Sequence, residues 1–201
     1  MNFIDRVFLT DYSREAVAAV MPAGMVYFTL ICFPLGLASY ATTFVAQYFG
    51  AGRSEQIGAA VWQGIWIGVL AAPLCLLMLP LAPWLFAAAG HDPAVAAGEV
   101  TYFQIMLVAA GATIIAAAQE AFFTGRGHTS MVMVVDAGAA ALNVLLDYAW
   151  IFGHWGFPES GIAGAAWATV IATWARVFVY AGLMLRRRVR THFGLLKQWR
   201  I

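Results

Sequence analysis

Residues 130–152, SMVMVVDAGAAALNVLLDYAWIF, decide the fold class of this chain. An α-helix needs about 20 mostly apolar residues to cross a bilayer, and this segment supplies them without a break. Its only charged side chains are Asp136 and Asp147. Polar and apolar residues do not alternate along it, as they would in a strand of a membrane β-barrel. The segment therefore predicts a membrane-spanning helix.

Four further segments meet the same criterion of length and apolarity. They are residues 25–48, 57–90, 100–123 and 161–185. Residues 57–90 contain three prolines, so we expect this helix to tilt, kink or end early. The connectors are short and rich in Gly, Pro and polar residues, so consecutive helices should be antiparallel neighbours. The predicted fold is an all-α integral membrane protein with five complete transmembrane helices.

The composition of the 201 residues supports this prediction. Hydrophobic residues make up 63% of the chain, against about 45–50% in ordinary globular proteins. Charged residues make up 10%, against about 25%. These values exclude a cytosolic enzyme, a nucleic-acid-binding protein and a disordered chain. Cys32 and Cys75 lie in apolar stretches and the four histidines are scattered, so we expect no disulfide, no bound metal and no cofactor.

The basic residues predict the orientation of the chain, because loops rich in Lys and Arg stay in the cytoplasm. The loops near residues 91–99 and 153–160 contain no Lys or Arg. Most basic residues fall on the other side: Arg53, Arg126, Arg186, Arg187, Arg188, Arg190, Lys197 and Arg200. We therefore expect a multi-pass protein of the cell inner membrane with a cytoplasmic C-terminal tail. The predicted domains are a transmembrane lobe over residues 1–185 and a basic tail or linker over residues 186–201.

With five spans and a cytoplasmic C-terminal tail, the first residues of the chain lie on the outer side of the membrane. Residues 1–10 make sense there as the outer end of another helix whose beginning is missing. The fold class then becomes five complete helices plus the end of a sixth at the N-terminus.

Three polar residues of the deciding segment share one face of the predicted helix. Asp136, Asn143 and Asp147 are spaced by seven and four residues, which places them within about 40° of one another. Ionisable groups inside a membrane are expensive and are candidates for function. A carboxyl group in a low-dielectric medium can exchange a proton near neutral pH. Carboxylate and amide oxygens also suit a hard cation such as Na⁺.

A structural role is the alternative for these residues. Asp136 lies near the predicted cytoplasmic end, so we regard it as a secondary candidate, and Asn143 could simply hold helices together. Arg176 is expected to reach toward the interface or to pair with Glu120. Small residues at spacings of four predict close helix packing along residues 161–172: Gly161, Ala165 and Thr169, and Gly164, Ala168 and Ala172.

Several stretches of the chain resemble the multidrug and toxic compound extrusion (MATE) family of antiporters. They are residues 45–53, VAQYFGAGR; residues 123–131, FTGRGHTSM; residues 141–148, ALNVLLDY; and residues 161–169, GIAGAAWAT. Their order and spacing across nearly the whole chain make the resemblance specific. Members of the family have twelve helices in two six-helix lobes, so the resemblance implies that this chain is the N-terminal lobe with a truncated first helix.

The resemblance also implies a cation-binding site. Asp5 matches an aspartate of the family's first helix, Asn143 and Asp147 match an Asn-Asp pair of its fifth helix, and Thr169 corresponds to a threonine of its sixth. H⁺ or Na⁺ would be the coupling ion. The implied partners are the lipid bilayer, drug-like small molecules, and either a missing C-terminal lobe or a second copy of the chain, with no nucleic acid.

The resulting expectation is a multidrug efflux antiporter, not an enzyme, that exports amphipathic and often cationic compounds. One alternative is a related flippase for lipid-linked saccharides, although one arginine against two aspartates and a glutamate in the spans favours cationic cargo. Another is a membrane fragment that transports nothing by itself. An intramembrane enzyme would need a clustered nucleophile and base, or metal ligands, and the spans show neither.

Overall fold

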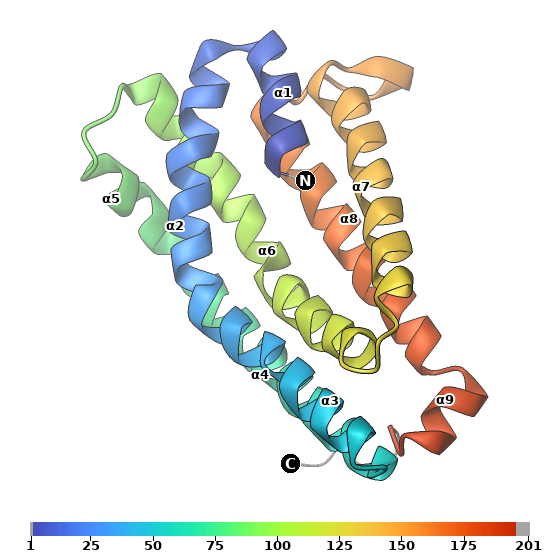
Figure 1. Cartoon of the computed structure of the whole chain (residues 1–201). Helices are drawn as coiled ribbons and strands as arrows, with labels where there is room; N and C mark the ends of the chain where they lie inside the picture. The colour runs from blue at the N-terminus through green and yellow to red at the C-terminus, as the bar shows by residue number, and fades with distance from the viewer. Residues whose placement is uncertain (1, 196–201) are drawn as a thin grey trace.

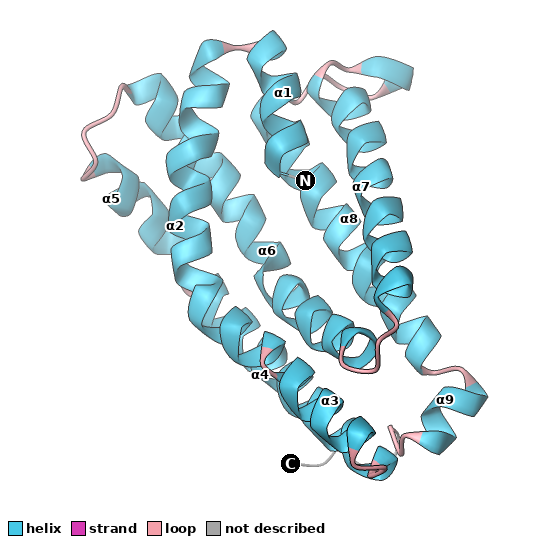
Figure 2. Ribbon diagram, in the orientation of Figure 1, coloured by secondary structure: helices cyan, strands magenta, loops and turns pink. Residues whose placement is uncertain are grey.

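The computed structural model describes residues 2–195, and this part of the chain is helical with no strand (Figures 1 and 2). Five helical segments are long and apolar enough to cross a membrane. They are Arg14–Gly50, Ser54–Ala87, Pro93–Thr124, Thr129–Ile151 and Gly161–Met184. The predicted all-α membrane fold with five spans is therefore confirmed.

The elements follow one another with short connections. They are α1 (Asn2–Tyr12), α2 (Arg14–Ser39), α3 (Ala41–Gly50), α4 (Ser54–Leu76), the 3₁₀ turn η1 (Leu79–Leu81), α5 (Ala82–Ala87), α6 (Pro93–Thr124), α7 (Thr129–Ile151), the 3₁₀ turn η2 (His154–Gly156), α8 (Gly161–Met184) and α9 (Arg187–His192).

Helix-capping residues extend two spans beyond the apolar runs that predicted them. The first span begins at Arg14, eleven residues before the predicted start, because the Ser13 side chain accepts a hydrogen bond from the backbone N–H of Ala16. The third span begins at Pro93 because Asp92 caps it in the same way. Both caps satisfy backbone donors that a helix end leaves unpaired. The predicted boundaries at residues 25 and 100 were therefore too late.

The prolines of the second span break it, as the sequence predicted. Helix α4 ends at Leu76, shortly after Pro73. Pro80 and Pro83 then lie in the first positions of η1 and α5. A backbone N–H in the first turn of a helix has no partner within that helix. Proline, which lacks an N–H, therefore costs no hydrogen bond at these positions.

Helix α6 is the central element of the lobe. It packs against α2, α4 and α8, and Figure 1 shows it between these helices. Helix α7 is more peripheral: it packs mainly on α8, and α1 contacts both of them. The polar side chains of α7 are therefore presented to α1 and α8.

The segment after α8 turns back toward the bundle. Phe193 and Leu195 are buried, and the indole N–H of Trp62 on α4 donates a hydrogen bond to the Leu195 carbonyl. The Arg126 guanidinium stacks on the rings of Phe122 and Phe193, 3.7 and 4.6 Å from their centroids. Of the predicted basic tail, Lys197 and Arg200 lie outside the described residues.

Glycines allow the helix backbones to approach closely where α4 crosses α6. A Cβ atom on Gly68 would lie 2.6 Å from Ile115 Cγ1 and 3.1 Å from the Gly111 carbonyl oxygen. The small residues of α8 do the same against α7, since a Cβ atom on Gly164 would lie 2.9 Å from the Trp150 carbonyl oxygen. Apolar side chains gain little by leaving lipid, so such close contact carries much of the association between membrane helices.

Replacement of Gly68 by alanine should destabilise the bundle. The added methyl group overlaps α6, and overpacking of this kind costs about 1–3 kcal/mol. The matched control is Gly138→Ala on α7, where a Cβ atom meets nothing within 4 Å. Thermal unfolding in detergent, followed by circular dichroism, should show a lower midpoint for Gly68→Ala than for the control. Equal midpoints would contradict the close approach of α4 and α6.

Candidate functional site

Helices α1, α7 and α8 bring four polar side chains together inside the bundle. Asp5 on α1 and Asn143 and Asp147 on α7 are fully buried, and Thr169 on α8 is almost so. We call these four residues the α1–α7–α8 site. They are the four residues for which the sequence predicted cation binding, and the structure gathers them from positions up to 164 residues apart.

Hydrogen bonds connect three of the four side chains. The Asn143 amide donates to Thr169 Oγ1 over 3.3 Å, and the Thr169 hydroxyl donates to Asp5 Oδ2 over 2.9 Å. Asp147 lies close enough to Asp5 for their carboxyl groups to interact electrostatically and to form a hydrogen bond when one of them is protonated. This chain of contacts fixes the position of α1 against α7 and α8.

The local sequence explains why these side chains can meet. Asn143 and Asp147 are one helical turn apart and so share a face of α7. Thr169 lies on α8 among buried alanines at 165, 166, 168 and 172. Side chains this small let α7 and α1 come close enough to α8 for a short hydroxyl to bridge them.

Several oxygen atoms of the site accept no hydrogen bond when both carboxyl groups are ionised. They are Asp5 Oδ1, Asn143 Oδ1 and both carboxyl oxygens of Asp147. Two neighbouring buried carboxyl groups cannot both stay ionised unless a positive charge compensates them. Carboxylate, amide and hydroxyl oxygens are the ligands that hard cations prefer. The arrangement therefore suits a bound proton or a hard monovalent cation.

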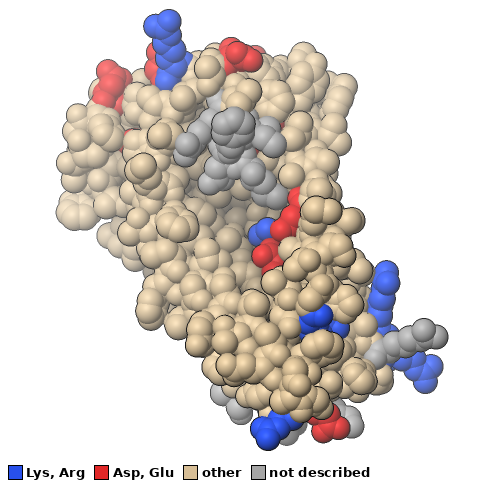
Figure 3. Space-filling view, viewed as in Figure 1, with Lys and Arg blue, Asp and Glu red and all other residues tan. Residues whose placement is uncertain are grey.

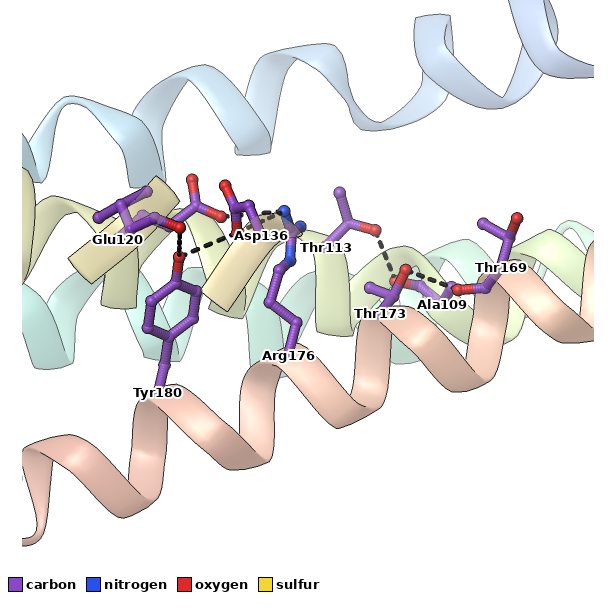
Figure 4. A network of polar contacts seen from close by, with 9 residues as sticks. Ala109, Thr113, Glu120, Asp136, Thr169, Thr173, Arg176 and Tyr180 are labelled. Atoms are coloured by element: carbon purple, nitrogen blue, oxygen red, sulfur yellow. Dashed lines mark hydrogen bonds and ion pairs between the residues drawn. The ribbon is translucent and has the colours of Figure 1, made fainter. Parts of the chain in front are cut away.

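Asp136 takes part in a different group of side chains. Arg176 Nη1 lies 3.1 Å from Glu120 Oε1 and 3.5 Å from Asp136 Oδ1, and the Tyr180 hydroxyl donates to Asp136 Oδ1 over 2.9 Å (Figure 4). We call these four residues the Arg176 cluster. The predicted pairing of Arg176 with Glu120 is confirmed. The face that Asp136 shares with Asn143 does not place it in the α1–α7–α8 site.

Sequence reasoning missed two polar partners. Tyr180 follows Arg176 by four residues, so helical spacing already placed both on one face of α8. Glu99 is fully buried, and its carboxylate lies 2.7 Å from His91 Nδ1. It escaped notice because the predicted third span began at residue 100, one residue too late to include it.

Replacement of Thr169 by valine should destabilise the association of α1 with the lobe. Valine keeps the shape of threonine but leaves the buried Asp5 carboxyl without its donor, which costs about 1–3 kcal/mol. The control is Thr169→Ser, which keeps the hydroxyl and loses only a methyl group. Thermal unfolding in detergent should rank the serine variant above the valine variant. If the two variants unfold together, the hydroxyl bridge does not stabilise the site.

Comparison with known proteins identifies relatives along most of the chain. The MatE family model matches residues 1–149. A probable multidrug resistance protein NorM of Rhizobium meliloti is 34% identical over 174 residues, which cover 85% of this chain and 36% of the relative. A second protein of that name, from Thermotoga maritima, is 28% identical over 181 residues, which cover 90% of this chain and 38% of the relative.

The fold also matches a solved structure, that of a MOP superfamily transporter from Pyrococcus furiosus. The TM-score is 0.83 at 22% identity, over 95% of this chain and 41% of that one. The chain thus spans less than half the length of the relatives it matches. The family model covers well over half of its residues, so the chain belongs to the MatE family of membrane transporters.

Proposed function

We propose that this chain forms the N-terminal lobe of a multidrug efflux antiporter of the inner membrane. The transporter would export amphipathic, often cationic compounds in exchange for H⁺ or Na⁺. The observation that carries this proposal is the α1–α7–α8 site, in which Asp5 and Asp147 lie buried together with unpartnered oxygens. The two NorM relatives, which are named as probable multidrug resistance proteins, also support multidrug efflux as the proposed function.

The coupling ion would act by changing how α1 packs. With both carboxyl groups ionised, Asp5 and Asp147 repel each other inside the bundle. Binding of a proton or Na⁺ removes that repulsion and favours the arrangement in which Thr169 holds Asp5 against α8. An ion shifts a conformational equilibrium only by its differential affinity for the two states, and α1 is the element whose position would differ.

The cargo path would require a partner for this lobe. Helices α2 and α7 expose large apolar side chains, including Phe28, Phe33, Met133 and Leu145, to whatever surrounds the lobe. These faces suit the lipid bilayer and either a second lobe or a second copy of the chain. The basic residues near α9 and the α3–α4 turn favour a cytoplasmic position for that end of the bundle.

The polarity of the lobe favours cationic over anionic cargo. Figure 3 shows acidic and basic atoms meeting in a hollow between the two ends of the molecule. In the Arg176 cluster, two carboxyl groups face one guanidinium group. A flippase for anionic lipid-linked saccharides would need a predominantly basic surface there.

Replacement of Asp147 by asparagine should abolish efflux. The change removes one of the two buried carboxyl groups and with it the charge that an ion would compensate, while the side chain keeps its size. The measurement is export of a cationic fluorescent dye from pump-deficient cells that express the complete reading frame containing this chain. The control is Asp11→Asn, an exposed acid of α1.

Dye export should fall to the background of cells without the transporter in Asp147→Asn and stay at the native level in Asp11→Asn. Equal amounts of each protein in the membrane must be verified by immunoblot. Native export by Asp147→Asn would overturn the assignment of the coupling site.

A further inference from the structure

The Arg176 cluster contains one more negative than positive charge. Glu120 comes from α6, Asp136 from α7, and Arg176 and Tyr180 from α8. Arg176 reaches both acids through the same atom, Nη1, which lies 3.1 Å from Glu120 Oε1 and 3.5 Å from Asp136 Oδ1 (Figure 4). A single guanidinium group can balance the charge of only one of them.

The cluster is partly buried in the bundle. Fractional exposure is 27% for the Glu120 side chain, 38% for Asp136 and 19% for Arg176, and Tyr180 is fully buried. All four residues lie within helices that span the membrane by length and composition. An uncompensated charge is expensive at such a position.

The surrounding groups do not remove the surplus charge. The Tyr180 hydroxyl donates to Asp136 but is itself neutral. Tyr27 on α2, whose hydroxyl lies 3.2 Å from Thr113 Oγ1 on α6, interacts with Arg176 only electrostatically. Among the described residues, the titratable and charged groups that act on the two acids are therefore each other, Arg176 and Tyr180.

We propose that Glu120 and Asp136 share one exchangeable proton and so form a second proton-binding site in this lobe. A proton is the smallest cation that can balance the surplus charge. Because Arg176 already contacts both acids, a proton can bind without moving these side chains apart. Asp136 precedes Asn143 by seven residues, about 10 Å along α7, so this proton is held at a different level from the α1–α7–α8 site. The proposal goes beyond the proposed antiport and does not depend on it.

Charge counting makes the proposal specific. Two acids and one arginine hold one proton. Glu120→Gln or Asp136→Asn leaves one acid balanced by Arg176, so either variant should hold none. Arg176→Gln leaves two unbalanced acids, so it should hold two. Tyr180→Phe changes no charge and should still hold one.

The experiment is infrared difference spectroscopy of the 201-residue chain in lipid nanodiscs, between about pH 8 and about pH 5. Protonated carboxyl groups have a distinct carbonyl band, and ordinary exposed acids remain ionised over most of this range because they titrate near pH 4. The measurement is made in an Asp5→Asn, Asp147→Asn background, which removes the carboxyl groups of the other site. Its outcome is therefore independent of whether that site couples transport.

The proposal predicts a carboxyl band in this background that Glu120→Gln and Asp136→Asn each remove and that Arg176→Gln doubles. Exchange of the exposed Asp11 for asparagine should leave it unchanged. Circular dichroism must show native helix content for each variant. If an acid variant does not fold, Arg176→Gln still tests the proposal, because it should double the band, and Tyr180→Phe is its charge-neutral control. A band absent from the background protein, or one that survives both acid replacements, would overturn the proposal and leave the cluster as a permanently ionised link between α6, α7 and α8.

Discussion

A charged side chain inside an apolar bundle costs free energy unless a neighbouring group compensates for it, and this cost organises the polar residues of the lobe. Helices α7 and α8 carry two different groups of such polar side chains. Near the α6–α7 turn, Arg176 pairs with both Glu120 and Asp136. Toward the other end of α7, Asp147 and Asp5 lie together, and among the described residues no arginine or lysine forms an ion pair with either of them. The first arrangement leaves one negative charge more than Arg176 can balance, and the second places two carboxyl groups together. We propose that a bound cation compensates each of them.

Close helix packing is what makes these arrangements possible. Glycine and alanine on α4, α6 and α8 let the backbones approach until short side chains such as Thr169 can bridge three helices. A larger residue at these positions would separate the helices and leave the polar groups unpaired. The same small residues that hold the bundle together therefore also set the geometry of the site.

The fold could be predicted from the sequence because the length and apolarity of each span are local properties. The helix starts at Arg14 and Pro93 were misplaced because caps by Ser13 and Asp92 lie outside the apolar runs. The candidate site was only partly predictable. Helical spacing placed Asn143 and Asp147 together, but it also grouped Asp136 with them. Spacing along one helix does not show which residues of the neighbouring helices lie opposite each turn. The inclusion of Asp5 and Thr169 came from resemblance to the MATE family alone.

The central claim is that the α1–α7–α8 site binds a proton or Na⁺, and thermal unfolding of the native chain tests it most directly. A ligand that binds the folded state raises the unfolding midpoint, and the stabilisation grows with the logarithm of its concentration relative to its dissociation constant. The midpoint should therefore rise when Na⁺ replaces a larger cation at constant ionic strength, or when the pH is lowered from neutral. In the Asp5→Asn, Asp147→Asn variant, that rise should be lost or sharply reduced. An identical rise in the native chain and the variant would show that the ion binds elsewhere and would contradict the account.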